Sequence, residues 1–448
     1  MHQRRHHSKY IVPLGLLAAL SVGCEESTSI RVGPSAVVDV DVANRAPVEA
    51  HLAIHPNDLN HLLGAAMMSA ITADTPEMLS RLSCGSFVSR DDGRTWDDHE
   101  FPVSRCFDPY VTILPNGRAI FSAFVGPASA LVVFTSEDGG ITWSEVPDTF
   151  GLRHDRPTST IARGRGSPDG ILYLVSSQYV GDTPRRRVVY VARSADGGRA
   201  FEPPVHLEPS PLDHFAEGAV VLPDDTLVVA YTESTDSAGD YLPRRRAWVL
   251  RSFDGGSTFT QPEFVTDACG PPYRLSWLAA DLSDGPFKNR LYFVCNLPGE
   301  SGVVVTHSTA DGGSWSDPVQ VHASPADTLV LRKVMAIAVS GDGVVSVAWV
   351  DARHAPPDRE CYDVYFAASL DGGESFLPDQ RVTESTSCPS EAANGAIGRI
   401  FVQSGGDYIG MVADPDGRFR LFWSDARDEK FHLRTGWVAV VGDVRSPN

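Results

Sequence analysis

The chain has little basic charge, no long apolar run and no sustained helical pattern. Lys and Arg total 38 against 57 Asp and Glu, a formal net charge of −19. This charge repels a phosphate backbone and disfavours nucleic-acid binding. No stretch is long and apolar enough to span a bilayer. Because helical apolar periodicity is missing while Gly (39) and Pro (32) are abundant, the composition favours a turn-rich β protein.

The first 24 residues read as a processing signal. Arg4, Arg5 and Lys9 form a basic region, and residues 11–20 form an apolar region too short to cross a membrane. The sequence Leu20-Ser21-Val22-Gly23-Cys24 then resembles the bacterial lipoprotein signal, which implies lipidation of Cys24. Ser21 stands where that signal usually has Leu, so plain secretion stays open as the alternative. We therefore expect an exported protein, secreted or held in the cell envelope, that touches the membrane only through an N-terminal lipid.

Six cysteines remain after Cys24, an even number that favours disulfides in an exported chain. Six cysteines allow fifteen connectivities, but they fall into three local pairs. The spacing lacks CxxC and His-x-x-x-His patterns, so we expect no metal site and no cofactor. The expected pairs are Cys84–Cys106, Cys269–Cys295 and Cys361–Cys388.

One phrase, Ser-x-Asp-x-Gly-x-Thr-aromatic, recurs along the chain and sets its organisation. Copies begin at Ser89, Ser136, Ser194, Ser252 and Ser369, and a shortened copy begins at Thr309. Their starts lie 47, 58, 58, 57 and 60 residues apart, which is the signature of a repeat architecture. Gly at the fifth position accepts positive φ, and the Asp side chain can bond nearby backbone N–H groups. The phrase is therefore predicted to be a hairpin turn, with its aromatic residue packed between sheets.

Each unit contains four short apolar strands, which is the composition of a β-propeller blade. Counting first strands predicts seven blades, with six as the alternative. The last unit, which begins near residue 408, lacks a fourth strand, and residues 36–42 are expected to supply it and close the ring. The predicted organisation is a signal at 1–24, a linker with the closing strand at 25–45, and an all-β propeller at 46–448.

The six phrases resemble the Asp-box, or bacterial neuraminidase repeat, of sialidase-like propellers, over roughly residues 46–443. The resemblance implies Asp-boxes on one face and a ligand site on the other, where all six cysteines would also lie. It further implies arginines that bind a substrate carboxylate, a Tyr nucleophile assisted by Glu, and an Asp acid/base. The family's Arg-Ile-Pro phrase is replaced here by residues 49–53, which read Glu-Ala-His-Leu-Ala.

Arginines at the ends of second strands are the candidate substrate-binding residues. Trp-x-Asp-Ala-Arg occurs twice, ending at Arg353 and Arg427, and Arg156 and Arg332 could complete a cationic ring. The alternative for each repeated motif is a local Asp–Arg ion pair. Two loops at equivalent positions carry Arg185–Arg187 and Arg244–Arg246. In an acidic protein they could gather anions, and the alternative is that they are solvated loop charges, which is the more usual outcome.

The candidate catalytic residues are Tyr408, Asp108 and Glu217, with Tyr110 and Glu233 as further candidates. The predicted function is that of a glycoside hydrolase of exo-sialidase type acting on terminal anionic sugars. The alternative is a non-catalytic surface propeller that binds a glycan or a protein. Hydrolysis of neutral glycans would instead require paired carboxylates facing the channel. We expect a monomer.

Overall fold

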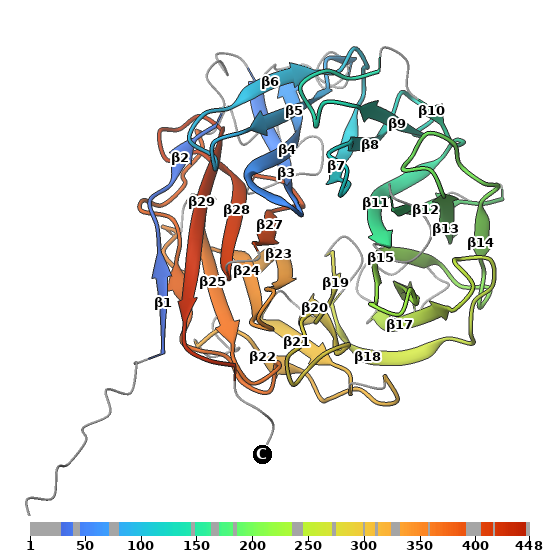
Figure 1. Ribbon diagram of the computed structural model, residues 1–448. Helices are drawn as coiled ribbons and strands as arrows, with labels where there is room; N and C mark the ends of the chain where they lie inside the picture. The colour runs from blue at the N-terminus through green and yellow to red at the C-terminus, as the bar shows by residue number, and fades with distance from the viewer. Residues whose placement is uncertain are drawn as a thin grey trace, which may run out of the picture.

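The computed structural model is a closed ring of seven antiparallel sheets (Figure 1), which confirms the seven-bladed propeller. It describes residues 28–38, 45–70, 80–144, 148–162, 170–181, 186–234, 245–270, 275–298, 301–309, 312–323, 332–356, 359–390, 405–414 and 417–444. The predicted signal and Cys24 lie outside these residues. In that described part, no helix is long and apolar enough to cross a membrane.

Each of the first six blades is a four-stranded meander that runs from the channel to the rim. Blade 1 comprises β3 (Arg45–His55), β4 (Asp58–Ala70), β5 (Ser83–Ser89) and β6 (Asp97–Glu100). Blade 2 comprises β7 (Phe107–Ile113), β8 (Ala119–Val125), β9 (Ala130–Ser136) and β10 (Asp148–Thr149). Blade 3 comprises β11 (His154–Ala162), β12 (Ile171–Tyr179), β13 (Arg187–Ser194) and β14 (Val205–Leu207). Blade 4 comprises β15 (His214–Val221), β16 (Leu227–Ser234), β17 (Arg245–Ser252) and β18 (Glu263–Cys269). Blade 5 comprises β19 (Trp277–Ala280), β20 (Leu291–Asn296), β21 (Val303–His307) and β22 (Val319–Gln320). Blade 6 comprises β23 (Arg332–Val339), β24 (Val345–Asp351), β25 (Asp363–Ser369) and β26 (Gln380–Arg381).

Blade 7 joins the two ends of the chain. Its inner strands are β27 (Gly410–Ala413), β28 (Arg418–Asp425) and β29 (His432–Val441). The outer edge of β29 pairs with β1 (Ser29–Val32) and β2 (Ala36–Val37) from the N-terminus. The N-terminal segment thus closes the ring, as expected, but it does so with two short strands, the longer of which precedes the predicted 36–42. These strands cover an edge that a three-stranded sheet would expose.

The Asp phrases are the turns between third and fourth strands, as predicted. In blade 2, Asp138 Oδ1 accepts hydrogen bonds from the backbone N–H groups of Ile141 and Thr142 at 3.1 and 2.8 Å. Its two oxygens also accept from the hydroxyls of Ser136 and Thr142 at 2.8 and 2.6 Å. Partial burial opposes ionisation, but these bonds prevail and lower the pKa of Asp138. The closing aromatic residue of every copy packs against a core cluster between sheets: Trp96, Trp143, Phe201, Phe259, Trp315 and Phe376.

Asp138→Ala is expected to destabilise the protein by about 1–2 kcal/mol, because it leaves two turn N–H groups without their acceptor. Catalysis or ligand binding at the opposite face should not change. Chemical denaturation of the variant beside the parent measures the loss. Asp148→Ala, an exposed substitution in the same blade, is the control and should be neutral. A loss of activity without a loss of stability would contradict a purely structural role for the turn.

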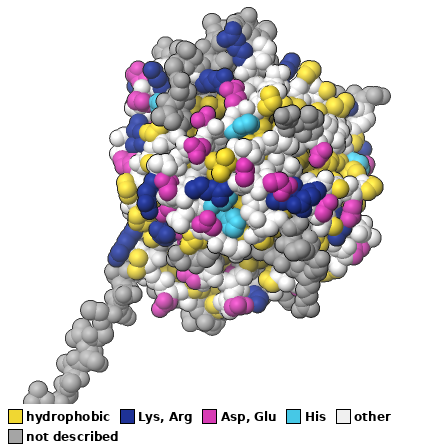
Figure 2. All heavy atoms as spheres, turned by 45° about the horizontal axis from the view of Figure 1, so that its top comes forward, with side chains coloured by type: hydrophobic (Ala, Val, Ile, Leu, Met, Phe, Trp, Pro, Cys, Tyr) yellow, Lys and Arg dark blue, Asp and Glu magenta, His cyan; other side chains and the backbone are white. Residues whose placement is uncertain are grey.

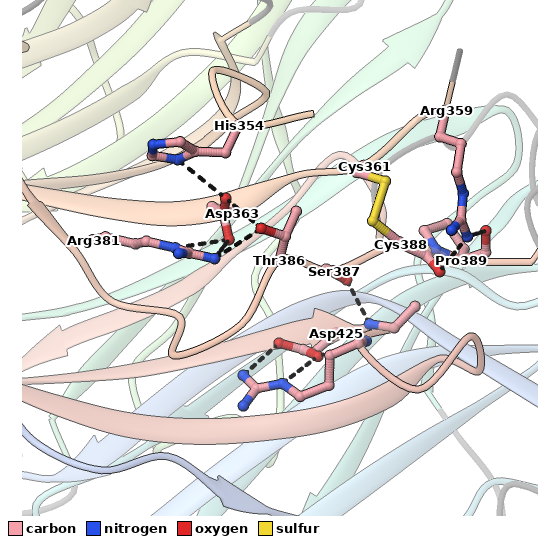
Figure 3. Close-up of a disulfide and its surroundings, with 12 residues drawn as sticks. His354, Arg359, Cys361, Asp363, Arg381, Thr386, Ser387, Cys388, Pro389 and Asp425 are labelled. Carbon is pink, nitrogen blue, oxygen red and sulfur yellow. Dashed lines mark hydrogen bonds and ion pairs between the residues drawn. A yellow bond between two sulfur atoms is a disulfide. The ribbon is translucent and has the colours of Figure 1, made fainter. Parts of the chain in front are cut away.

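Three disulfides join the predicted pairs. The Cα–Cα distances are 5.7 Å for Cys84–Cys106, 5.6 Å for Cys269–Cys295 and 4.4 Å for Cys361–Cys388. Each bond connects neighbouring loops or strand ends on the face opposite the Asp turns, and Figure 3 shows the third beside Asp363 and Asp425. Disulfides persist in oxidising compartments, so these bonds indicate an extracytoplasmic protein.

Candidate functional site at the channel

Bulges at the start of the inner strands place charged side chains at the channel. The register shifts between Val48 and His51 in β3, and equivalent shifts occur in β7, β11, β15 and β23. In the first three of these strands the bulged residue has positive φ: 57° at Glu49, 49° at Asp108 and 48° at Arg156. A β-bulge re-aims a side chain, and bulges are common beside active sites. Inner strands begin on the face opposite the Asp turns, so the cluster lies on the face that the sequence predicted to hold a ligand.

Arg156 is the buried hub of this cluster. Its guanidinium forms an ion pair with Glu217 and donates to the Ser276 carbonyl at 2.6 Å. Its backbone N–H donates to Asp108 Oδ2 at 3.1 Å. Glu217 also accepts from the Thr232 hydroxyl at 2.7 Å and from the Ser276 backbone N–H at 2.9 Å. Arg156 is 1 % exposed and Glu217 is fully buried, so this ion pair is shielded from solvent and Glu217 holds the Arg156 guanidinium in place.

Two arginines from the predicted loop triplets, Arg187 and Arg245, lie beside Arg156 and not in solvent. Arg187 forms ion pairs with Asp213 at 2.6 Å and Asp155 at 3.2 Å. Arg245 lies 3.5 Å from Glu217 and donates to the Thr232 hydroxyl at 2.9 Å. Burial lowers the pKa of Arg245 to about 10, although Glu217 opposes the shift. All three guanidinium groups lie over the Phe215 ring, at 4.5 to 5.7 Å from its centre. Strand pairing within blades 3 and 4 carries these loop-end arginines into the interior.

Two carboxyl groups and a phenol form the second half of the cluster. The Asp108 backbone N–H donates to Glu49 Oε2 at 3.2 Å, and the two carboxyl groups also hydrogen bond to each other. Tyr408 hydrogen bonds to the Asp108 carboxylate. Burial and the neighbouring Asp155 raise the pKa of Asp108 to about 7, and burial with Asp108 raises the pKa of Glu49 well above its usual range. Burial and the neighbouring carboxylates thus both oppose full ionisation of the Glu49–Asp108 pair.

Aromatic rings line the same end of the channel. His51 stacks on Tyr110 with ring centres 3.7 Å apart, and Trp277 lies 6.4 Å from Tyr110 and 6.0 Å from Tyr408. Trp277 also covers the Arg156 guanidinium at 4.3 Å. Burial raises the pKa of Tyr110 to about 12. An aromatic wall beside paired carboxyl groups suits a ligand with apolar and polar faces, such as a sugar ring.

The other predicted arginines lie elsewhere. Arg353 forms ion pairs with Asp351 and Asp379 and covers the Tyr365 ring at 3.8 Å. Arg427 forms the equivalent pairs with Asp425 and Glu384, at 2.9 and 2.7 Å. The repeated Trp-x-Asp-Ala-Arg motif therefore builds local ion pairs, and the described contacts do not bring Arg353 or Arg427 to Arg156.

Arg332 and Glu233 are the two remaining predicted residues. The side chain of Arg332 lies outside the described part of the structure, although its backbone begins β23. Glu233 accepts from the Ser210 hydroxyl at 2.5 Å and lies 3.5 Å from His214. Its described contacts do not include Tyr408.

At the surface, Figure 2 shows basic and acidic side chains lying next to one another on the visible face.

Comparison with known proteins supports the repeat assignment. Residues 68–241 match the family model described as BNR repeat-like domain. The matched segment covers less than half of the chain, contains three of the six Asp phrases and runs from blade 1 into blade 4. No curated protein matches the chain.

Several solved structures are similar to this chain at low sequence identity. A protein of unknown function from Dyadobacter fermentans is 13% identical, with a TM-score of 0.52 over 92% of this chain and 99% of that one. A Hadza microbial sialidase is 13% identical, with a TM-score of 0.49 over 91% of this chain and 92% of that one. A Penicillium chrysogenum alpha-L-arabinanase complexed with arabinobiose is 14% identical, with a TM-score of 0.47 over 73% and 94%. At 13% identity, the likeness to the Dyadobacter fermentans protein shows the fold alone.

Sequence reasoning missed Glu49 as a site residue. It begins the segment that stands in place of the family's Arg-Ile-Pro phrase, and that position was the available signal. Gly406 lies against it with φ 119°, where an added Cβ would come within 2.4 Å of the Glu49 nitrogen. The Glu49 N–H donates to the Gly405 carbonyl at 3.1 Å. The segment just before Tyr408 in blade 7 is thereby held against Glu49 in blade 1.

Proposed function

We propose that this propeller is an exported glycoside hydrolase with Tyr408 as nucleophile and the Glu49–Asp108 pair as acid/base. The observation that carries the proposal is the hydrogen-bonded cluster of Tyr408, Asp108 and Glu49 at one end of the channel. Three groups from three different blades converge there, and a titratable carboxyl near neutrality suits proton transfer.

In the proposed reaction the Tyr408 oxygen bonds to the anomeric carbon while its proton passes to the carboxyl pair. The bond to the leaving-group oxygen breaks, and that oxygen takes a proton from the same pair. The pair thus begins and ends the step with one proton. Arg156, 6.0 Å from the Tyr408 ring, stabilises the developing phenolate charge. In the second step a water oxygen bonds to the anomeric carbon and the bond to Tyr408 breaks. The pair takes one proton from the water and returns one to the Tyr408 oxygen, which restores the starting state.

The identity of the terminal sugar has two candidates. An anionic sugar of the sialic acid type is supported by three arginines around Phe215 and by a tyrosine nucleophile, which avoids repulsion from a substrate carboxylate. A neutral sugar is favoured by the pairing of those arginines, since Arg156, Arg187 and Arg245 each already contact a carboxylate. The carboxylates of the cluster would also repel an anion.

The alternative to catalysis is a surface propeller that binds a glycan or a protein through the same face. In either case we propose that lipidation at Cys24 anchors the protein to the cell envelope, because the sequence before it has the basic and apolar regions of an export signal.

The test is hydrolysis by the purified protein of a fluorogenic sialoside and of a panel of neutral aryl glycosides, arabinofuranosides included. We expect turnover of at least one substrate, and loss of that turnover in Asp108→Asn. Turnover confined to neutral glycosides would reject the sialidase form. If the folded protein turned over none of them, the hydrolase proposal would fail and the binding alternative would replace it.

A further inference from the structure

A groove lies on the outer side of the propeller, between blades 4 and 5. Its volume is about 460 Å³, and it is walled by residues 264–268 of β18 and by residues 315–318, with residues 297–298 at one end. None of these residues belongs to the channel cluster. The groove therefore needs an explanation of its own.

The groove follows the edge of a strand. Side chains of a strand alternate between its two faces, so a groove lined by five consecutive residues runs along the strand edge and not over one face. β18 is the outermost strand of blade 4 and pairs only with β17 among the described strands. In the described part of the chain, no backbone group outside blade 4 bonds to the backbone of residues 264–268. Such an edge is a template for an added strand.

The walls of the groove carry negative charge and aromatic surface. Asp267 on one wall and Asp317 on the other are exposed, and neither has an ion-pair partner among the described residues. Phe264 is 47% exposed and meets Trp248 edge-on. The Trp315 indole is fixed because its N–H donates to Glu263 at 2.6 Å. Carboxylates beside aromatic faces attract Lys and Arg side chains, both by charge and by cation–π contact.

We propose that this groove binds an extended, basic polypeptide segment, which adds to β18 as a fifth strand of blade 4. Main-chain hydrogen bonds to the β18 edge supply affinity, and a Lys or Arg side chain between Asp267 and Asp317 supplies specificity. The net charge of −19 attracts a basic partner and repels a second copy of this chain. The site is a docking surface and does not depend on hydrolysis in the channel.

The test is a calorimetric titration of the purified full chain with a seven-residue peptide that alternates valine and lysine and has both ends blocked. Three matched probes accompany it: the peptide with glutamate in place of lysine, the lysine peptide with N-methylated alternate amides, and cellotetraose. The protein variants are Asp267→Asn with Asp317→Asn, and, as a control, Asp97→Asn with Asp98→Asn on β6, the outer strand of blade 1.

We expect the lysine peptide to bind and the other three probes to bind at least tenfold more weakly. The Asp267/Asp317 variant should also bind the lysine peptide at least tenfold more weakly, and the Asp97/Asp98 variant should bind it as the parent does. Equal weakening in both variants would mean unspecific attraction and overturn the proposal. Equal binding of the N-methylated peptide would overturn strand addition, and preferential binding of cellotetraose would assign the groove to a glycan instead.

Discussion

Tyr408→Phe should lower kcat/KM on the substrate that the parent hydrolyses by about 10³-fold or more, since it removes the oxygen of the proposed nucleophile. The reason is geometric. Tyr408 is the phenol that hydrogen bonds to Asp108, and its ring lies beside Arg156 and Trp277. Steady-state kinetics measure the loss, and the denaturation midpoint shows whether the variant remains folded.

Tyr365→Phe is the matched control. Tyr365 is also a buried tyrosine, and its hydroxyl bonds to His354 at 2.9 Å in blade 6. Tyr365→Phe removes one phenolic oxygen and leaves the channel cluster unchanged, so kcat/KM should stay within about twofold of the parent. Near-parental activity of Tyr408→Phe would remove Tyr408 from the mechanism and leave the carboxyl pair as the only candidate chemistry.

Glu217→Ala should destabilise the protein by about 3–5 kcal/mol, the usual cost of breaking a buried ion pair on one side. The substitution leaves Arg156 and Arg245 buried without the carboxylate between them. It also removes the acceptor of the Ser276 N–H and the Thr232 hydroxyl. Equilibrium denaturation in urea measures the change.

Two further variants test whether this loss of stability comes from the buried ion pair. Glu217→Gln keeps hydrogen-bonding capacity and should lose less stability than Glu217→Ala. Glu208→Ala breaks the exposed pair with Arg186, in which Glu208 is 46% exposed, and should cost under about 1 kcal/mol. If Glu217→Ala and Glu208→Ala proved equally mild, Glu217 would not hold the cluster together.

The repeats made the architecture predictable, whereas the site was only partly so. The Asp phrase is a local structure: Asp138 bonds to residues within four positions of itself, so its sequence specifies its turn. The cysteine pairs could be predicted because alignment of the repeats places both members of a pair, such as Cys84 and Cys106, on the same face of the propeller. Local chemistry of this kind is visible in a single sequence.

The channel cluster depends on contacts between blades, which a single sequence does not display. Tyr408 and Asp108 were named from their positions at strand starts, but their hydrogen bond joins blades 7 and 2. Arg187 and Arg245 appeared as loop charges because their carboxylate partners lie outside their own loops, at Asp213 and Glu217. Bulges that turn Glu49 and Arg156 inward leave no mark in hydrophobic periodicity.

Ring closure by β1 pairs a strand near the beginning of the chain with one near its end. Ser29 pairs with Val441, more than four hundred positions away, so this seam forms only after β29 has been synthesised. Contacts of such sequence separation form slowly. Until then the outer edge of β29 lacks its partner strands and is open to pairing with another chain. A chain that stops short of β29 would therefore lack the seam that joins its two ends.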